Sequence, residues 1–274
     1  MPELPEVETI VRDLRPRVVG RTFGAVSLSH DDVLRGTTRR RLLGGLRGAT
    51  VRGLARRAKH AVFDLGSRRL VVQPGMTGSL QVHDRTLTPD EKRYAVLTAE
   101  LDDTRRLIYS DVRRLGTLLL LDDAAWRAYD RAIGPEPLDP SFTAEQLGRI
   151  FARSRQAVKK VLMDQRHLAG VGNIYANEAL FAAGVDPSRA ARSLDGTETA
   201  RVYAEVRRIL DAAIASQGTT FRDYRTGTGE PGNFQLELLV YGREGEPCRR
   251  CGTRLAGTHA VDARITVFCH RCQR

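Results

Sequence analysis

Four cysteines near the end of the sequence have the spacing of a metal site. Cys248 and Cys251 form one CxxC pair, and Cys269 and Cys272 form a second pair after 17 intervening residues. Two such pairs on neighbouring hairpins can direct four thiolates at one tetrahedral ion, which is the pattern of a structural zinc site. We predict one bound Zn²⁺ that stabilises a small module without doing chemistry, because four thiolates leave no position for a substrate. Two disulfides or four free thiols are the alternatives.

The first residues of the sequence offer a nucleophile. If the initiator methionine is removed, Pro2 exposes a secondary amine beside the carboxyl group of Glu3. An α-amino group titrates at about pH 7.7–8.0, so a useful fraction is unprotonated at neutral pH and can attack an electrophilic sugar carbon. The neighbouring carboxyl group can move the protons of such a reaction. A plain helix start is the alternative, since Pro5 suits a first turn and apolar residues follow at helical spacing from Val7.

Excess positive charge predicts the class of partner. Lys and Arg number 44 against 33 Asp and Glu, a net charge of +11, and 40 of the 44 bases are Arg. Residues 33–63 hold nine Lys or Arg and no acid, and residues 248–274 hold six Arg and one Asp. This balance favours a polyanion, and neutralising its phosphates would make binding steeply salt-dependent. A solvated basic face is the alternative.

Length and hydrophobic content exclude several classes of protein. The 274 residues suggest roughly two domains, and 41% hydrophobic content is too high for a disordered polyelectrolyte. The longest apolar run, within 115–121, is far shorter than the roughly 18 residues of a membrane span. The N-terminus lacks the basic and then apolar pattern of a secretory signal. We therefore expect a soluble, cytoplasmic, globular protein without a membrane segment.

The residues that could do chemistry or bind metal must be positioned by secondary structure, and the two halves of the sequence differ in their hydrophobic pattern. Short runs rich in Val, Leu, Ile and Thr predict strands of a mostly antiparallel sheet or sandwich at 22–29, 61–65, 70–73, 94–101 and 117–121. Apolar residues at helical spacing predict a compact helical unit over 144–151, 157–162, 174–183 and 197–216. Pro135, Pro137 and Pro140 cluster where the pattern changes and predict a linker over 134–141.

Six separated blocks of the sequence carry a family resemblance. They are MPELPEVET at the start, RRAKHAVFDLG at 56–66, GMTGSL at 75–80, DVRRLG at 111–116, LMDQRHLAGVGNIYANEALFAAG at 162–184, and RITVFC at 264–269 within the four-cysteine segment. In this order they resemble the formamidopyrimidine-DNA glycosylases, which are bacterial base-excision enzymes for oxidised purines. The resemblance implies an α+β multidomain fold. An N-terminal helix and antiparallel β-sandwich would occupy 1–133, a helix-two-turn-helix DNA-binding domain 142–239, and a four-cysteine zinc ribbon 240–274.

The resemblance also implies a chemistry. It is that of a bifunctional DNA glycosylase and abasic-site lyase, which removes 8-oxoguanine and formamidopyrimidines and then cleaves the abasic site by successive β and δ elimination. The nucleophile would be Pro2, which forms a Schiff base with the sugar, and the proton shuttle would be Glu3. Lys59 would assist elimination and Arg264 the second elimination step. Glu6 is either a second participating carboxylate or a helix-capping charge.

Two kinds of DNA contact are expected. An everted base leaves a space that side chains must fill, and Met76, Arg113 and Leu115 match the void-filling positions of the family, which usually has Phe in place of Leu115. Contacts to the DNA backbone are expected from Tyr94, Arg113, Arg155, Lys159 and Asn173. The alternatives are core packing for Met76 and Leu115, a helix cap for Asn173, and a solvated face for the basic residues. Tyr94 and the pair Gln73-Pro74 also depart from the family pattern.

A polar, glycine-rich segment at 218–232 is the candidate lesion-recognition loop. Such a loop can fold over an everted base and read it with backbone amides. The residues expected to take part are Thr219, Thr220, Arg222, Tyr224 and Arg225. A disordered connector is the alternative.

Three other functions share part of this sequence pattern. A superfamily member that prefers oxidised pyrimidines has similar motifs, and a non-catalytic zinc-ribbon protein that binds damaged DNA would share the charge and the cysteines. Retention of Met1 would favour the non-catalytic protein, because a blocked Pro2 nitrogen cannot form an iminium. A zinc-ribbon subunit of a transcription complex leaves the N-terminal block unexplained. The expected partner is damaged double-stranded DNA, bound by a monomer.

Overall fold

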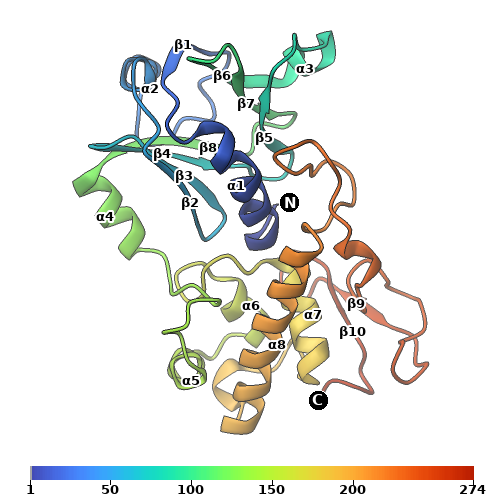
Figure 1. Ribbon diagram of the computed structural model, residues 1–274. Coiled ribbons are helices and arrows are strands. Elements are labelled where there is room, and N and C mark those ends of the chain that lie inside the picture. The colour runs from blue at the N-terminus through green and yellow to red at the C-terminus, as the bar shows by residue number, and fades with distance from the viewer. Residues whose placement is uncertain (1) are drawn as a thin grey trace. The chain divides into compact units, whose positions relative to one another are not determined.

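The computed structural model describes residues 2–274, and it divides into two compact units (Figure 1). The first unit runs to Arg131 and also includes Ser216–Asn233. The second comprises Ala132–Ala215 and Phe234–Arg274. Met1, whose removal the N-terminal chemistry requires, lies outside the described residues. Within 2–274, none of the helices combines the length and apolar character that crossing a bilayer needs.

The predicted N-terminal helix is confirmed as α1 (Leu4–Val18). Its apolar side chains recur at helical spacing, and those of Val7, Ile10, Val11, Leu14 and Val18 are fully buried. This face packs on strands β2 (Gly53–Arg57), β3 (His60–Asp64) and β5 (Gly78–His83) of the first unit. The buried face therefore fixes the position of the first turn of α1 on these strands.

Two antiparallel sheets form the predicted β-sandwich. One has the strand order β1-β6-β7-β5, with β1 (Phe23–Leu28), β6 (Ala95–Leu101), β7 (Arg106–Asp111) and β5 (Gly78–His83). The other has the order β2-β3-β4-β8, with β2 (Gly53–Arg57), β3 (His60–Asp64), β4 (Arg68–Gln73) and β8 (Thr117–Asp122). Apolar side chains from both sheets and from α1 share one core.

Short helices cover parts of this unit that the strand pattern did not predict. These are α2 (Arg39–Leu46), α3 (Pro89–Tyr94) and α4 (Asp123–Arg131). The last of them, labelled in Figure 1, contacts β4 and β8. Its Ala125, Trp126 and Tyr129 pack on the apolar cluster Val62, Val71, Leu119 and Leu121. The aliphatic run of β8 is thus buried on both sides.

The second unit contains the predicted helices and the cysteine module. The helices are α5 (Ala144–Ala152), α6 (Val158–Met163), α7 (Asn173–Ala183) and α8 (Gly196–Ala215), with short 3₁₀ turns at Ala191–Ser193 and Phe234–Leu236. A two-stranded antiparallel ribbon follows, β9 (Ala256–Thr258) and β10 (Thr266–Phe268). The ribbon shares its small core with Phe181 of α7. Glu178 of α7 also accepts hydrogen bonds from the amides of Leu239, Val240 and Tyr241 at 2.8–2.9 Å.

These units differ from the predicted domain boundaries in two respects. The glycine-rich segment at 218–232 belongs to the first unit and not to the helical one, because α1 supplies its hydrogen-bond partners. The cysteine module groups with the helices, because it shares the core and the Glu178 contacts just described. The first break in the chain falls after Arg131, just before the predicted linker.

Candidate active site and metal site

The start of α1 is held by one carboxylate. Glu3 N–H donates to Glu6 Oε2 at 2.8 Å, and Thr219 N–H donates to Glu6 Oε1 at 2.8 Å. Pro2, Glu3 and Glu6 are all buried. A carboxylate in the first turn also interacts favourably with the helix dipole. The helix-capping alternative for Glu6 therefore matches the geometry, and the same side chain fastens the glycine-rich segment to the helix.

Lys59 lies in a tight hairpin turn. Arg57 of β2 pairs with His60 of β3, which leaves Ala58 and Lys59 as a two-residue loop. The φ of Ala58 is +51°, in the region that favours glycine and costs other residues about 1–2 kcal/mol. This single positive φ at the first loop position is the pattern of a type II′ turn. Lys59 is buried, with 6% of its surface exposed.

A hydrogen-bonded chain links this turn to α1. Glu8 of α1 accepts from Arg56 Nε at 2.9 Å, and Arg56 Nη1 donates to Ala58 O at 3.1 Å. Burial opposes ionisation of Glu8, but its hydrogen bonds and ion pairs with Arg12 and Arg56 outweigh that effect and lower its pKa. The two segments expected to do chemistry, at Pro2-Glu3 and at Lys59, are thus parts of one connected structure.

The three expected void-filling residues lie on two adjoining loops. Met76 and Leu115 are 44% and 54% exposed, which excludes the core-packing alternative for both. Arg113 Nη2 lies 2.8 Å from Met76 Sδ, and Arg113 N–H donates to Thr77 Oγ1 at 3.0 Å. A methyl group on Gly75 would lie 2.7 Å from the carbonyl carbon of Leu115, so only glycine permits this approach.

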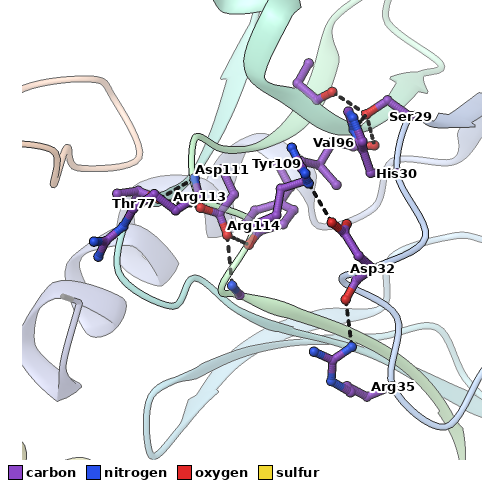
Figure 2. Close-up of polar contacts among 12 residues, drawn as sticks. Ser29, His30, Asp32, Arg35, Thr77, Val96, Tyr109, Asp111, Arg113 and Arg114 are labelled. Atoms are coloured by element: carbon purple, nitrogen blue, oxygen red, sulfur yellow. Dashed lines mark hydrogen bonds and ion pairs between the residues drawn. The ribbon is translucent and has the colours of Figure 1, made fainter.

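Asp111 connects these two loops, although it was not predicted as a site residue. It is 2% exposed, and Figure 2 shows it beside Thr77, Tyr109 and Arg113. Oδ1 accepts from Thr77 Oγ1 at 2.5 Å, and Oδ2 accepts from Tyr109 Oη at 2.9 Å and Gly116 N–H at 2.8 Å. Burial and the nearby Asp111 charge raise the pKa of Tyr109, so its hydroxyl remains a donor. The signal in the sequence was a lone acid within DVRRLG, at the last residue of β7.

The glycine-rich segment is a folded loop on α1. Tyr224 Oη donates to Gln217 O at 3.0 Å and to Glu6 O at 3.3 Å. Gly227 N–H donates to Asp13 Oδ2 at 3.0 Å. Thr220 Oγ1 accepts from Gly232 N–H at 2.9 Å and so closes the base of the loop. Thr219 and Tyr224 are buried, whereas Arg222 is exposed, and this folded arrangement argues against a disordered connector.

The structure does not support the phosphate contact predicted for Lys159. Its side chain is fully buried, and Nζ donates to Ile265 O at 3.0 Å and to Thr266 Oγ1 at 2.8 Å. The ammonium group therefore anchors the strand of the cysteine module and does not face a phosphate. Asn173, the first residue of α7, adds a hydrogen bond from Nδ2 to the same carbonyl at 3.1 Å.

Other residues expected to contact DNA lie on exposed or partly exposed segments. Arg264 is exposed and directly precedes the anchored residue Ile265. Arg155 is exposed between α5 and α6. Tyr94 ends α3, with the Arg93 guanidinium 5.6 Å from its ring centre.

The cysteines are arranged to hold one metal ion. All four Sγ atoms lie within 4.8 Å of one another. The separations are 3.6 Å between Cys251 and Cys269 and 4.0 Å between Cys248 and Cys272. Four bonds of about 2.3 Å to a tetrahedral Zn²⁺ place the sulfurs about 3.8 Å apart, whereas a disulfide needs about 2 Å. The arrangement fits a metal and excludes the disulfide alternative.

Known proteins resemble this chain along its whole length. Residues 1–118 match the model of the formamidopyrimidine-DNA glycosylase N-terminal domain, and residues 133–225 match that of its H2TH (helix-two-turn-helix) domain. The formamidopyrimidine-DNA glycosylase of Stutzerimonas stutzeri is 41% identical over 100% of both chains, and that of Thermomicrobium roseum is 40% identical over 100% of this chain and 99% of the relative. The chain belongs to the formamidopyrimidine-DNA glycosylase family.

Solved structures of the family share this fold. A mutant of the Lactococcus lactis formamidopyrimidine-DNA glycosylase, in complex with DNA containing Fapy-dG, is 32% identical with a TM-score of 0.91 over 100% of both chains. The Thermus thermophilus protein is 38% identical with a TM-score of 0.88, over 99% of this chain and 98% of that one. Family membership therefore accounts for both units, including the cysteine module.

Proposed function

We propose that this member of the formamidopyrimidine-DNA glycosylase family removes oxidised purines from double-stranded DNA and then cleaves the resulting abasic site. The observation that carries the proposal is the pairing of Pro2 with Glu3 at the start of α1, held by Glu6. The Lys59 turn and the exposed loops of Met76 and Arg113 lie in the same unit. A Lactococcus lactis relative has been crystallised with DNA containing Fapy-dG, and another crystal contains an abasic site.

The proposed reaction begins at the Pro2 nitrogen, freed by removal of Met1. The amine attacks C1′ of the damaged nucleotide, the bond from C1′ to the base breaks, and the base leaves with a proton. Opening of the sugar ring leaves an iminium between Pro2 and C1′. The iminium draws electrons from C2′, so loss of a C2′ proton expels the 3′ phosphate, and a second elimination expels the 5′ phosphate.

Side chains of this protein would supply the proton transfers and charge stabilisation. Glu3 moves protons to and from the sugar, as a carboxyl group beside the nucleophile can. Lys59 stabilises the first departing phosphate and Arg264 the second. Met76, Arg113 and Leu115 fill the space of the everted base. The loop at 218–232 reads that base through Thr219, Thr220, Arg222, Tyr224 and Arg225.

Binding to the DNA backbone would involve both units. Arg155, Tyr94 and the basic residues within 33–63 neutralise phosphates. The first amides of α7, beginning at Asn173, can also bind a phosphate, because the first turn of a helix presents N–H groups without intrahelical partners. A Zn²⁺ held by the four cysteines would stabilise the ribbon that presents Arg264.

Borohydride trapping tests the proposal. Wild-type protein, shown by mass spectrometry to lack Met1, should form a covalent adduct with duplexes that contain 8-oxoguanine opposite cytosine or an abasic site. Glu3→Gln should lose the adduct on 8-oxoguanine, because base release needs the carboxyl group. A variant with an uncleaved residue before Pro2 should lose it on both DNAs.

The outcomes separate the alternatives. If a zinc-loaded protein without Met1 forms no adduct with either DNA but still binds them, the non-catalytic damage-binding protein is the better description. Adducts with oxidised pyrimidines and none with 8-oxoguanine would assign the chain to the pyrimidine-preferring branch.

A further inference from the structure

We propose that His60 and Tyr129 are positioning residues for Lys59, with α4 acting as the brace that holds the Lys59 turn. The inference rests on the proposed function, in which Lys59 takes part in elimination. It begins from the turn itself, where Ala58 occupies a backbone conformation with φ of +51° that alanine disfavours. Conformations of this kind persist where the surrounding structure holds them.

One contact between the turn and α4 joins two side chains. His60 directly follows Lys59 and is 8% exposed. Its Nδ1 lies 3.0 Å from Arg57 O, and because a carbonyl only accepts, Nδ1 carries the proton. In the neutral ring, the other nitrogen, Nε2, then accepts from the Tyr129 hydroxyl at 3.0 Å. Burial raises the pKa of Tyr129, so its hydroxyl stays protonated as this contact requires.

A second contact lies on the other side of Lys59. Arg57 Nε donates to Asp130 Oδ1 at 2.6 Å, and Arg57 Nη2 donates to Asp130 O at 3.4 Å. Both strand residues that flank the two-residue loop, Arg57 and His60, are therefore fastened to neighbouring residues of α4.

The helix can serve as a brace because it is itself fixed. Trp126 and Tyr129 pack on Val71 and Leu119 of the sheet. The Trp126 ring is stacked on the Tyr129 ring, with centroids 6.2 Å apart, and the Tyr129 ring meets His60 edge-on at 5.6 Å. The Tyr129 hydroxyl is thereby held at one position relative to the turn.

The test removes the hydroxyl and leaves the ring. Tyr129→Phe should lower kcat for incision of abasic-site DNA about 3- to 10-fold, the loss expected for one hydrogen bond, with KM changed less than about twofold. Tyr203→Phe is the matched control, because its hydroxyl also donates a hydrogen bond, at 2.7 Å to Phe142 O, but in the other unit. His60→Gln keeps an acceptor for Tyr129 and should retain more activity than His60→Leu.

A double-mutant cycle distinguishes positioning from general stability. In a Lys59→Ala background, Tyr129→Phe should cause no further loss of kcat, because the residue it positions is gone. An equal loss in both backgrounds, or wild-type kcat for Tyr129→Phe while Lys59→Ala is impaired, overturns the inference and leaves the proposed function intact. Full activity of Lys59→Ala would instead overturn the role of Lys59 and the inference with it.

Discussion

Lys159 and Arg155 are both basic and lie four residues apart, yet their environments are opposite. Lys159 is fully buried against Ile265 and Thr266, whereas Arg155 faces solvent. Residue type and proximity to the helical motif predicted a phosphate contact for both. Burial separates a residue that anchors the cysteine module from one that can meet DNA.

The salt dependence of DNA binding checks this difference. Lys159→Met should leave the slope of log K against log salt unchanged while lowering stability by about 1–3 kcal/mol, because it removes a buried donor. Arg155→Ala, the exposed counterpart, should reduce the slope by about 0.9 if it neutralises one phosphate. A slope reduced to the same extent by Lys159→Met would restore the phosphate role.

The ion pairs of Glu8 predict how the stability of the protein depends on pH. Its pKa in the folded protein lies below the usual 4.5, so its contribution to stability is present above pH 4.5 and is lost as pH falls through the lower folded value. Glu8→Gln should therefore destabilise the protein at pH 7 and less so at a pH below the folded pKa, as measured by urea unfolding. The exposed pair of Asp32 with Arg114 is the control, and Asp32→Asn should have little effect at pH 7. A Glu8→Gln effect that grows as pH falls would contradict the assignment.

At the scale of elements, three loops and one helix depend on shared carboxylates. Asp111 joins the loop of Met76 to that of Leu115 (Figure 2), and Glu6 joins α1 to the folded loop at 218–232. Each of the two loops at 75–77 and 218–232 is therefore shaped by a partner outside its own segment. Its geometry should respond to a substitution of that partner.

Asp111→Asn should loosen the two void-filling loops together. An amide presents one acceptor oxygen where the carboxylate receives three donors, so we expect a loss of about 1–3 kcal/mol. Base eversion, followed by 2-aminopurine fluorescence beside the lesion, should become slower. The exposed variant Asp102→Asn, whose carboxylate pairs with Arg21 outside both loops, should leave eversion at the wild-type rate. Equal rates in Asp111→Asn and wild type would refute the coupling.

Deletion of Thr226–Gly229 tests the loop on α1. These residues form a hydrogen-bonded turn and include Gly227, whose N–H donates to Asp13. If the loop reads the base, release of 8-oxoguanine should slow at least about 10-fold, while cleavage of a preformed abasic site is spared. Equal loss of both activities would show that the deletion disturbs the common chemistry.

At the scale of the whole molecule, both units carry residues expected to act on DNA. Pro2, Glu3 and Lys59 belong to the sandwich unit, while Arg264 belongs to the unit with the helices and the cysteine module. Full-length relatives cover both units. The cysteine module should therefore matter for activity although it lies outside the unit that holds the proposed nucleophile.

Metal removal tests this dependence. Purified protein should contain one zinc per chain, and chelation should weaken DNA binding at least about 10-fold while the strand signal of the sandwich persists in circular dichroism. The physical reason is that the small core of the module needs the metal, whereas the sandwich has a large core of its own. Reloading with Zn²⁺ should restore binding. Unchanged binding after complete removal would count against the role of the module.

The sequence by itself determined those features that reside in local pattern. Apolar periodicity predicted α1, five of the eight sandwich strands and the helices of the second unit, and the cysteine spacing predicted the metal site. The strands β2, β5 and β7 were not predicted. The six blocks were sufficient to indicate the family. Tertiary structure alone decided that Lys159 is buried, that Asp111 joins two loops, that the segment at 218–232 packs on α1, and that α4 braces the Lys59 turn. Each depends on contacts between separate elements of the chain, and periodicity carries no information about which side chain a distant element will meet.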